Sequence, residues 1–358
     1  MHIPSSEPKS GPRVVAWELT RRCPLSCKHC RASARATADK NELSTEACFR
    51  VVDSLVAHGS KPLLILTGGE PLSRTDVWDI AKRASDGGLR VVMAPCGTSV
   101  NAESVSKMIA SGVKAISLSM DGATAEKHDA FRGVPGAFAA NLSAMKFARE
   151  AGLPFQINAL VSRETVNDLP TIRDFALREG ATQLDLFFLV PVGRGAALKD
   201  IALSAAESEH ALEWAVEENA NGPLPIKTTC APQVVRVRHR LKGALPTPQH
   251  GAKGGPPLGG CMAGRGFVFI SHVGILQPCG FCDLPAGDLQ HFNYNFPAAY
   301  AASEVFRKLQ NVDGYGGKCG LCEFRAVCGG CRARALAAAG DYLAEEPSCP
   351  YSPQGATP

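Results

Sequence analysis

Three cysteines near the start of the chain have the spacing of ligands to one metal cluster. Cys23, Cys27 and Cys30 form a CxxxCxxC pattern directly after an apolar run, Val14–Leu19, that predicts a strand. Three thiolates can bind three irons of a cubane and leave the fourth iron open to an outside ligand. On its own the spacing is also compatible with a zinc site or with chance. The pattern therefore predicts a metal site at the end of the first strand.

A second group of cysteines lies near the other end of the chain. Eleven of the 14 cysteines fall within 23–30 and 261–349, while Cys48, Cys96 and Cys230 stand apart. In a chain of this size without an export signal, such groups favour metal ligands or redox thiols over disulfides. Paired CxxC motifs also occur in zinc sites, which is the alternative for the last group. The C-terminal cysteines are Cys261, Cys279, Cys282, Cys319, Cys322, Cys328, Cys331 and Cys349.

Composition limits the partners that this protein could have. The 358 residues are 45% hydrophobic and carry a net charge of +4 without a basic run, so the chain shows no signature of nucleic-acid binding. The first residues, MHIPSSEPKSGPR, lack the apolar core of a signal peptide, and no run approaches eighteen apolar residues. We expect a cytoplasmic protein that does not bind membranes.

Strands and helices alternate between residues 13 and 200, which predicts a parallel sheet covered by helices. Such a sheet, open or closed into a partial barrel, places its chemistry at the carboxyl ends of the strands. Residues 201–260 predict a helical bridge, Ala205–Asn219, followed by a Gly/Pro-rich linker, and residues 261–349 a small cysteine-rich domain. The six predicted strands are Val14–Leu19, Leu63–Thr67, Arg90–Ala94, Ala115–Met120, Phe155–Val161 and Gln183–Val190. The predicted helices are Thr45–His58, Thr75–Asp86, Ala102–Ala110, Ala137–Ala151 and Leu169–Glu179.

The N-terminal half resembles the radical S-adenosylmethionine (SAM) superfamily. The resemblance rests on CxxxCxxC, on Gly68-Gly69-Glu70-Pro71 after the second strand, and on the segment 117–122. It implies a partial (β/α)6 TIM-like barrel and a [4Fe–4S] cluster on the first three cysteines, whose open iron binds SAM. Ser119 and Asn158 could instead satisfy strand ends, and the ring of His29 could only shield the cluster. The implied SAM-binding residues are His29, Gly68, Gly69, Glu70, Pro71, Ser119, Asn158 and Val190.

The C-terminal cysteines resemble the SPASM domain of radical SAM enzymes, which carries two auxiliary [4Fe–4S] clusters. The resemblance implies a distal cluster on Cys319, Cys322, Cys328 and Cys349 and an inner cluster on Cys261, Cys279 and Cys331. This chain departs from the common pattern, because two residues instead of three separate the last two cysteines of the knot. We predict Cys282 as the fourth inner ligand, with an open iron site or Cys230 as alternatives.

Within the superfamily, the chain is most similar to the haem-biosynthesis branch, which acts on iron-coproporphyrin, sirohaem derivatives and haem d1 precursors. Five runs carry this similarity: 15–20, 129–136, 267–274, 328–335 and 340–347. The resemblance implies oxidative decarboxylation of porphyrin propionates to vinyl groups by a 5′-deoxyadenosyl radical, with an auxiliary cluster accepting the surplus electron. Candidate partners for the tetrapyrrole carboxylates are Arg132, Arg194, Arg265, Arg332 and Arg334.

Two other functions remain open at this point. A SPASM-type maturase would use the same clusters to form a thioether, an epimerised centre or a carbon–carbon crosslink in a peptide; such enzymes usually carry a leader-recognition module, which we do not find here. A non-enzymatic iron–sulfur electron carrier would have no need of the Gly-Gly-Glu-Pro motif. The resemblance also implies a low-potential electron donor such as flavodoxin or ferredoxin. The sequence leaves open the substrate, the fourth inner ligand, the oligomeric state and the identity of the donor.

Overall fold

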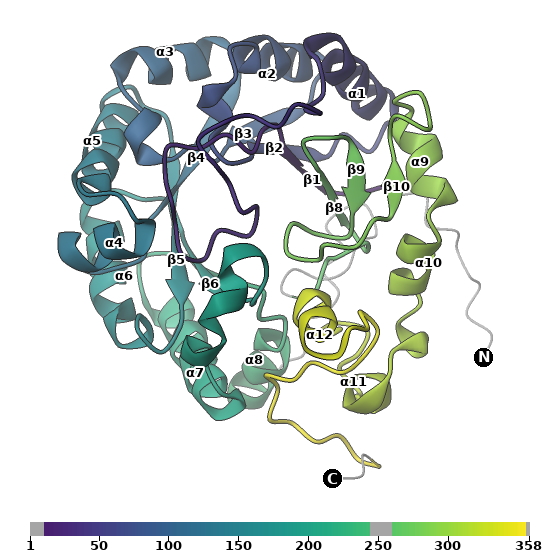
Figure 1. Cartoon of the computed structure of the whole chain (residues 1–358). Coiled ribbons are helices and arrows are strands. Elements are labelled where there is room, and N and C mark those ends of the chain that lie inside the picture. Colours follow the sequence, from purple (N-terminus) through teal and green to yellow (C-terminus); the bar gives the residue numbers. More distant parts are fainter. Residues whose placement is uncertain (1–10, 244–259, 356–358) are drawn as a thin grey trace.

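The chain folds around one sheet that curves into an incomplete barrel (Figure 1). The computed structural model describes residues 11–243 and 260–355. The strand order is β10-β9-β8-β1-β2-β3-β4-β5-β6-β7, and the strands from β8 to β7 pair in parallel, whereas β9 pairs antiparallel with β8 and β10. The strands are β1 (Val14–Glu18), β2 (Leu63–Thr67), β3 (Arg90–Met93), β4 (Val113–Ser119), β5 (Phe155–Val161), β6 (Leu184–Phe188), β7 (Ile226–Thr229), β8 (Phe267–Ile270), β9 (Ile275–Gln277) and β10 (Gly287–Asp288).

Helices cover the outside of the sheet, and the C-terminal helices lie between α8 and β10 in the ring (Figure 1). Local sequence fixes several helix starts: Ser44 caps α1, and Asn101 with Ser104 forms a capping box on α3. None of the helices in the described part of the chain is both long and apolar enough to span a membrane. The helices are α1 (Thr45–Ala57), α2 (Val77–Asp86), α3 (Ala102–Ala110), α4 (Ala125–Arg132), α5 (Ala137–Glu150), α6 (Leu169–Arg178), α7 (Ala205–Asn221), α8 (Val234–Lys242), α9 (Phe296–Ala302), α10 (Glu304–Gln310), α11 (Gly317–Leu321) and α12 (Arg332–Ala339).

The two faces of the sheet differ in their exposure. In β2, Leu64 and Leu66 are fully buried under the outer helices, whereas Ile65 and Thr67 on the opposite face keep part of their surface accessible. The same alternation along β4 leaves Ser119 partly exposed on the inner face. Because successive side chains of a strand point to opposite faces, the inner face of the barrel is the one that can receive ligands.

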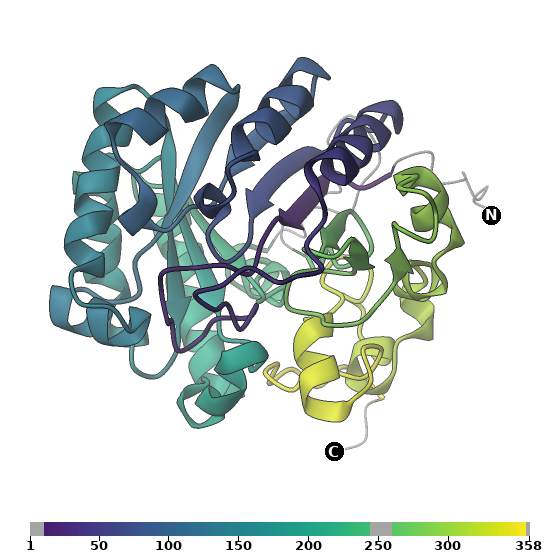
Figure 2. The same cartoon turned by 45° about the horizontal axis from the view of Figure 1, so that its top comes forward.

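The long segment between β1 and α1 crosses the end of the barrel where the strands finish (Figures 1 and 2). The backbone ties it down at two places: the N–H of Cys23 donates to the carbonyl of Arg35 at 2.8 Å, and the N–H of Lys28 donates to the carbonyl of Phe131 at 3.0 Å. The CxxxCxxC motif therefore lies over the carboxyl ends of the strands, where chemistry was predicted.

The predicted α/β partial barrel is confirmed, and the bounds predicted for β2, β5 and α3 agree with the structure. Around the barrel, α4, β7 and α8 were not predicted, and in the C-terminal region neither β10 nor the helices α9 to α12 were. Helix α4 has a weak apolar pattern, because two of its three buried residues, His128 and Arg132, are polar. In β7, only Ile226 is fully buried, so the strand lacks the apolar run of its neighbours.

The sheet crosses both boundaries that the sequence suggested. Strand β7 extends it from within the predicted bridge 201–260, and β8 from within 261–349 pairs with β1. The proposed division into three domains stays a prediction. Of the predicted Gly/Pro-rich linker 246–260, residues 246–259 lie outside the described part of the chain.

Candidate functional site

The three N-terminal cysteines form one small group at the carboxyl ends of the barrel strands. All three are free thiols; Cys23 and Cys27 are buried and Cys30 is partly buried. Each sulfur accepts one hydrogen bond: Cys23 from the Leu25 N–H at 3.4 Å, Cys30 from the Ala34 N–H at 3.4 Å, and Cys27 from a guanidinium N–H at 3.5 Å. Donors of this kind stabilise thiolates bound to iron, so the loop fits a cluster ligand set.

The guanidinium beside Cys27 belongs to Arg132, the last residue of α4. Its Nη2 atom lies 2.5 Å from Oδ2 of Asp121, which is buried at the end of β4. Burial opposes ionisation of Asp121, but Arg132 and the nearby His29 and His128 outweigh it and lower the pKa of Asp121. The sequence made Arg132 a candidate substrate contact, which stays a prediction; the structure pairs it with Asp121 and places its Nη1 atom beside the sulfur of Cys27.

His29 lies between the cysteine loop and the barrel. Its ring stacks on Phe131 with centroids 4.9 Å apart, and its Nε2 atom is 3.8 Å from Oδ2 of Asp121. Burial lowers the pKa of His29 to about 4, so the ring is neutral at pH 7. Its Nδ1 atom is buried without a hydrogen-bond partner among the described residues, which leaves one polar atom of the ring for a ligand.

The Gly-Gly-Glu-Pro motif packs directly against the backbone that leads to Cys23. A Cβ atom on Gly68 would lie 2.5 Å from the carbonyl oxygen of Thr20, and one on Gly69 would lie 2.5 Å from that of Arg22. The N–H of Gly69 donates to Thr20 at 2.6 Å, and the N–H of Glu70 donates to Arg22 at 2.8 Å. Only glycine permits this approach, which holds the start of the cysteine loop against the end of β2.

Glu70 is fully buried, and its carboxylate accepts hydrogen bonds from the N–H of Leu72 at 2.8 Å and of Cys96 at 2.6 Å. Burial, and then the neighbouring Cys96 thiol, raise the pKa of Glu70 well above its ordinary value. Sequence reasoning gave Cys96 no role, yet it packs against the cysteine group and its thiol is within hydrogen-bond reach of Cys23. Contact of Glu70 with the amino group of SAM stays a prediction.

The remaining residues predicted for SAM fall in two places. Ser119 and Asn158 are neighbours across β4 and β5 on the inner face, and the Asn158 amide oxygen accepts from Gln156 at 2.8 Å. Val190 is buried against Cys282 and Cys331 in the C-terminal part of the molecule. Its backbone continues into the turn 190–195, where the N–H of Arg194 donates to the carbonyl of Cys30 at 3.0 Å. The structure therefore places this turn between the N-terminal and C-terminal cysteines.

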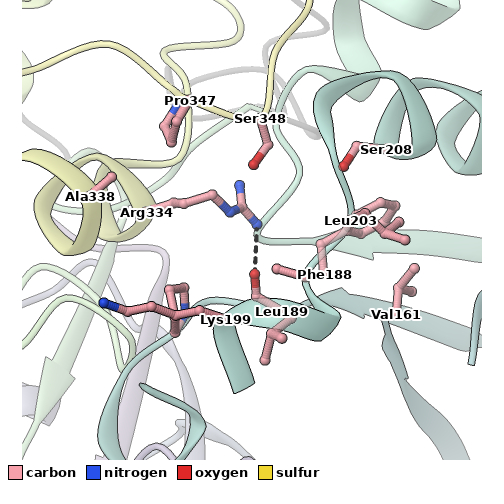
Figure 3. A pocket seen from close by; sticks show the side chains of 12 residues that line it. Val161, Phe188, Leu189, Lys199, Leu203, Ser208, Arg334, Ala338, Pro347 and Ser348 are labelled. Carbon is pink, nitrogen blue, oxygen red and sulfur yellow. Dashed lines mark hydrogen bonds between the residues drawn. The ribbon is translucent and has the colours of Figure 1, made fainter. Parts of the chain in front are cut away.

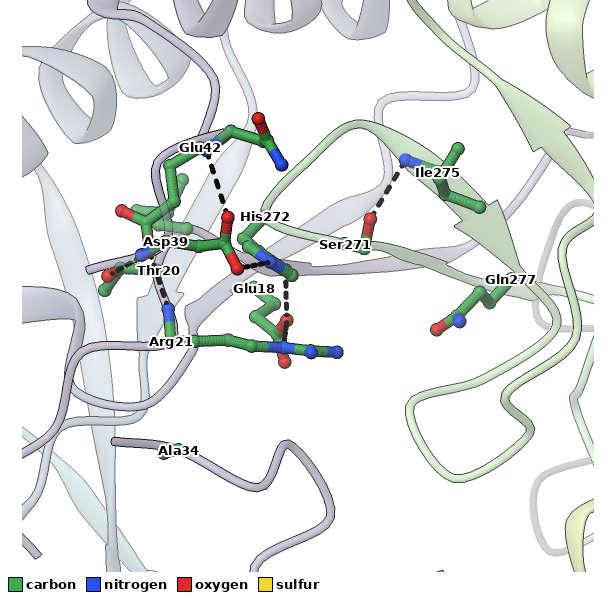
Figure 4. Close-up of polar contacts among 12 residues, drawn as sticks. Glu18, Thr20, Arg21, Ala34, Asp39, Glu42, Ser271, His272, Ile275 and Gln277 are labelled. Atoms are coloured by element: carbon green, nitrogen blue, oxygen red, sulfur yellow. Dashed lines mark hydrogen bonds and ion pairs between the residues drawn. The ribbon is translucent and has the colours of Figure 1, made fainter. Parts of the chain in front are cut away.

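A buried polar network joins the cysteine loop to β8 (Figure 4). The carboxylate of Glu18, at the end of β1, lies 2.9 Å from a guanidinium nitrogen of Arg31 and 3.2 Å from one of Arg21. It also lies 2.8 Å from Nδ1 of His272. Burial alone would raise the pKa of Glu18, but Arg31, His272 and Arg21 lower it to about 2. Arg31 also lies over the ring of Phe269, 4.3 Å from its centroid. This network fixes the residue after Cys30 to the strand that leads toward the C-terminal cysteines.

Four C-terminal cysteines line one pocket. Around it, the N–H of Glu346 donates to the sulfur of Cys319 at 3.3 Å. Burial, and then its thiol neighbours, raise the pKa of Cys328, as expected where several thiols face one another. The four are Cys319, Cys322, Cys328 and Cys349.

A second group surrounds Cys331, which is buried at the start of α12. Cys230 adjoins it from the end of β7, with φ at +61°, a left-handed conformation that is strained for a residue with a side chain. The hydrogen bond from the Cys230 thiol lowers the pKa of Cys331 to about 7. Cys282 is fully buried, and burial raises its pKa to about 12. The group comprises Cys230, Cys261, Cys279, Cys282 and Cys331.

These groups have no geometry for a single ion. Within residues 11–243 and 260–355, no three His, Cys, Asp or Glu side chains are placed to hold one metal ion. The structure instead gathers the cysteines into three separate groups, one at the barrel and two near the C-terminus.

Arg334 lies at the joint between the barrel and the C-terminal region (Figure 3). Its guanidinium extends from α12 into a mostly apolar cavity of about 160 Å³ and donates to the carbonyls of Leu189 at 3.3 Å and Cys230 at 2.9 Å. It also forms a buried ion pair with Glu346 at 3.0 Å. The carboxylate of Glu346 accepts a hydrogen bond from the N–H of Cys331 at 2.8 Å. The ion pair therefore supports the group of cysteines around Cys331.

The other three arginines proposed for substrate also have protein partners. Arg194 donates to the carbonyl of Cys27 at 2.9 Å, and Arg265 donates to that of Ala326 at 2.7 Å. Arg332 is fully buried and contacts Cys319. These contacts favour roles in holding the cysteine sites over roles in binding substrate, and their contact with substrate stays a prediction.

Comparison with known proteins identifies the family. A profile of the Radical SAM superfamily matches residues 17–176. The chain is 43% identical over 349 residues, 97% of this chain and 94% of the relative, to the AdoMet-dependent heme synthase of Nitratidesulfovibrio vulgaris. This protein belongs to the radical SAM superfamily.

More distant similarities are to peptide-modifying enzymes. This radical SAM protein is 28% identical to the PqqA peptide cyclase of Granulibacter bethesdensis, over 96% of this chain and 88% of the relative. Its fold matches that of Streptococcus suis SuiB bound to S-adenosylmethionine with a TM-score of 0.75 and 15% identity, covering 96% of this chain and 78% of SuiB. The family implies SAM and one [4Fe–4S] cluster as cofactors, and Cys23, Cys27 and Cys30 form the group that fits the cluster.

Proposed function

We propose that this radical SAM protein converts Fe-coproporphyrin III into haem by oxidative decarboxylation of two propionate side chains. The observation that carries the proposal is its 43% identity to an AdoMet-dependent heme synthase along nearly the full length of both chains. Removing a hydrogen atom from the propionate β-carbon, carbon dioxide from its carboxylate and one electron leaves a vinyl group. The reaction therefore needs both a radical source and an electron acceptor.

The cysteines meet both needs in separate places. When bound, the cluster on Cys23, Cys27 and Cys30 and its SAM supply a 5′-deoxyadenosyl radical, and auxiliary clusters supply a place for the surplus electron. We assign the distal cluster to Cys319, Cys322, Cys328 and Cys349. We assign the inner one to Cys261, Cys279, Cys282 and Cys331, because these four thiols act on one another's pKa, whereas Cys230 is held to Cys331 by a thiol hydrogen bond.

The surrounding residues position the reacting groups. Arg132 donates to Cys27 while Asp121 neutralises its charge, so the sulfur is held without a net charge beside it. The inner face of β4 and β5, with Ser119 and Asn158, is the surface that we assign to SAM. The turn 190–195 packs on the Cys30 backbone and restricts access of water to the cysteine loop from that side.

Peptide modification is the second candidate, supported by the 28% identity to a peptide cyclase. It ranks lower because the heme synthase shares half again as many residues with this chain over a similar length. We also propose a low-potential donor such as flavodoxin or ferredoxin, and a cytoplasmic location.

The decisive experiment is anaerobic turnover of the reconstituted, reduced protein with SAM and Fe-coproporphyrin III. We expect mass spectrometry to show two successive losses from the porphyrin, each of one carbon dioxide and two hydrogen atoms, with about one 5′-deoxyadenosine per loss. Unchanged porphyrin together with continuing SAM cleavage would refute the porphyrin substrate and favour a peptide. Absence of 5′-deoxyadenosine from fully loaded protein would refute both enzymatic functions.

A further inference from the structure

Arg332 is a fully buried cation without a carboxylate partner among the described residues. Its Nη1 atom donates to the carbonyls of Tyr342 at 3.1 Å and Ala344 at 2.6 Å, and its Nε atom to that of Gly330 at 3.2 Å. Its guanidinium carbon lies 4.6 Å from the centroid of the Tyr315 ring. Carbonyls and an aromatic face satisfy hydrogen bonds but carry no full negative charge, and burying an uncompensated charge is costly.

The remaining hydrogen bond of Arg332 points to a cysteine. Its Nη2 atom donates to the sulfur of Cys319 at 3.6 Å. A Cβ atom on Gly330 would lie 2.5 Å from this Nη2 atom and 2.9 Å from the same sulfur, so a glycine here lets the guanidinium reach Cys319. The cation is thus aimed at the edge of the pocket that Cys319 shares with three other cysteines.

The neighbouring Arg334 provides a contrast within the same helix. It is also buried, but Glu346 pairs with it at 3.0 Å and cancels its charge. The charge of Arg332 also reaches Cys261 and Cys282 of the inner group. Its side chain, however, donates a hydrogen bond to the sulfur of Cys319 in the distal group. A cubane bound by four thiolates carries net negative charge and can provide the missing anion.

We propose that Arg332 is the buried counter-charge of the distal cluster and raises the reduction potential of that cluster more than that of the inner one. The inference rests on the auxiliary clusters of the proposed function. A positive charge close to a cluster stabilises its reduced form, which carries one more negative charge, and the low polarity of a buried site strengthens the effect. Arg332 acts here on the cluster, as a positioning residue.

The test is a redox titration of the auxiliary clusters by electron paramagnetic resonance. The full-length chain with Cys23, Cys27 and Cys30 replaced by alanine leaves only the auxiliary signals, and Arg332→Met and Arg332→Lys are compared in it. At a fixed potential we expect Arg332→Met to lower the ratio of reduced to oxidised distal cluster about tenfold, a shift of about 59 mV for one electron. The inner cluster should shift by less, because Arg332 reaches Cys261 and Cys282 through its charge but hydrogen-bonds to Cys319. Arg332→Lys should restore most of the distal ratio.

Arg325→Met is the matched control, because Arg325 lines the same pocket but is partly exposed and pairs with Asp313. It should leave both titrations unchanged. Equal potentials in Arg332→Met and the parent, with all iron retained, would overturn the proposal. If Arg332→Met loses the distal iron, retention in Arg332→Lys supports a charge role, and loss in both variants assigns Arg332 to packing alone and refutes it. Absence of auxiliary iron in the parent chain would instead refute the proposed clusters.

Discussion

The N-terminal cysteine site and the two C-terminal sites are built in opposite ways. The first takes all its thiols from eight consecutive positions and holds them with nearby backbone N–H groups and one neutralised cation, Arg132. The others take their thiols from segments between Cys230 and Cys349, and depend on β7, β8 and α12 to bring them together. A site confined to one loop can be specified locally, whereas the C-terminal sites exist only once the chain has folded.

The independence of the three sites can be tested by removing the N-terminal cysteine site and measuring whether the two C-terminal sites still bind iron. Replacing Cys23, Cys27 and Cys30 by alanine should abolish 5′-deoxyadenosine formation, at least a thousandfold, because no open iron remains for SAM. Because the C-terminal sites share no ligand with the loop, iron per chain should fall by only about a third. Both quantities are measured on anaerobically reconstituted protein.

Cys48→Ala is the control for this change. Cys48 is buried in α1, and burial raises its thiol pKa to about 12, so it behaves as a small apolar residue. It should retain full iron and full SAM cleavage. Unaltered SAM cleavage in the triple variant would contradict the assignment of the loop, and loss of all iron would show that the three sites are not independent.

A narrower test concerns which thiols complete the inner site. Cys282→Ala should remove about one cluster's worth of iron, because Cys282 is fully buried among Cys261, Cys279 and Cys331. Cys230→Ala should keep that iron and change only its spectrum, since we assign Cys230 as a hydrogen-bond donor to Cys331. Iron analysis with Mössbauer spectroscopy distinguishes the two. The reverse result, iron lost with Cys230 and kept with Cys282, would exchange their roles.

The sequence predicted what depends on local pattern and missed what depends on tertiary contact. The strands of the barrel were found because most of them carry apolar residues on both faces and so read as short apolar runs. Helix α4 was missed, and with it the link from Arg132 to Asp121, because a helix that buries polar residues has little periodicity. Likewise, nothing local to Cys96 shows that it adjoins Cys23 and Glu70.

The surroundings of Arg332 and Arg334 also depend on tertiary contacts that the sequence does not reveal. Sequence reasoning assigned Arg332 and Arg334 to substrate because a tetracarboxylate needs cations. The structure buries both beside cysteines, and Arg334 but not Arg332 has Glu346 as an ion-pair partner. Which cation is neutralised is a property of the folded chain, since Glu346 lies on a segment beyond α12.

The polar network around Glu18 connects the N-terminal cysteine loop to β8, and changing it should have a small effect on stability. Glu18→Gln removes the charge that Arg31, Arg21 and His272 share, and should lower the thermal midpoint by about 3 °C, corresponding to about 2 kcal/mol for a chain of this length. The folded pKa of Glu18 is about 2, below its unfolded value, so its contribution is complete above about pH 4.5 and disappears only as the pH falls toward 2. The deficit in thermal midpoint should therefore be constant from pH 6 to 8.5, as measured by calorimetry of the reconstituted protein.

Glu103→Gln is the control, because Glu103 is an exposed carboxylate paired with Lys107. It should shift the midpoint by less than about 1 °C. A deficit that varies between pH 6 and 8.5 would contradict the assignment of the interaction to the charge of Glu18.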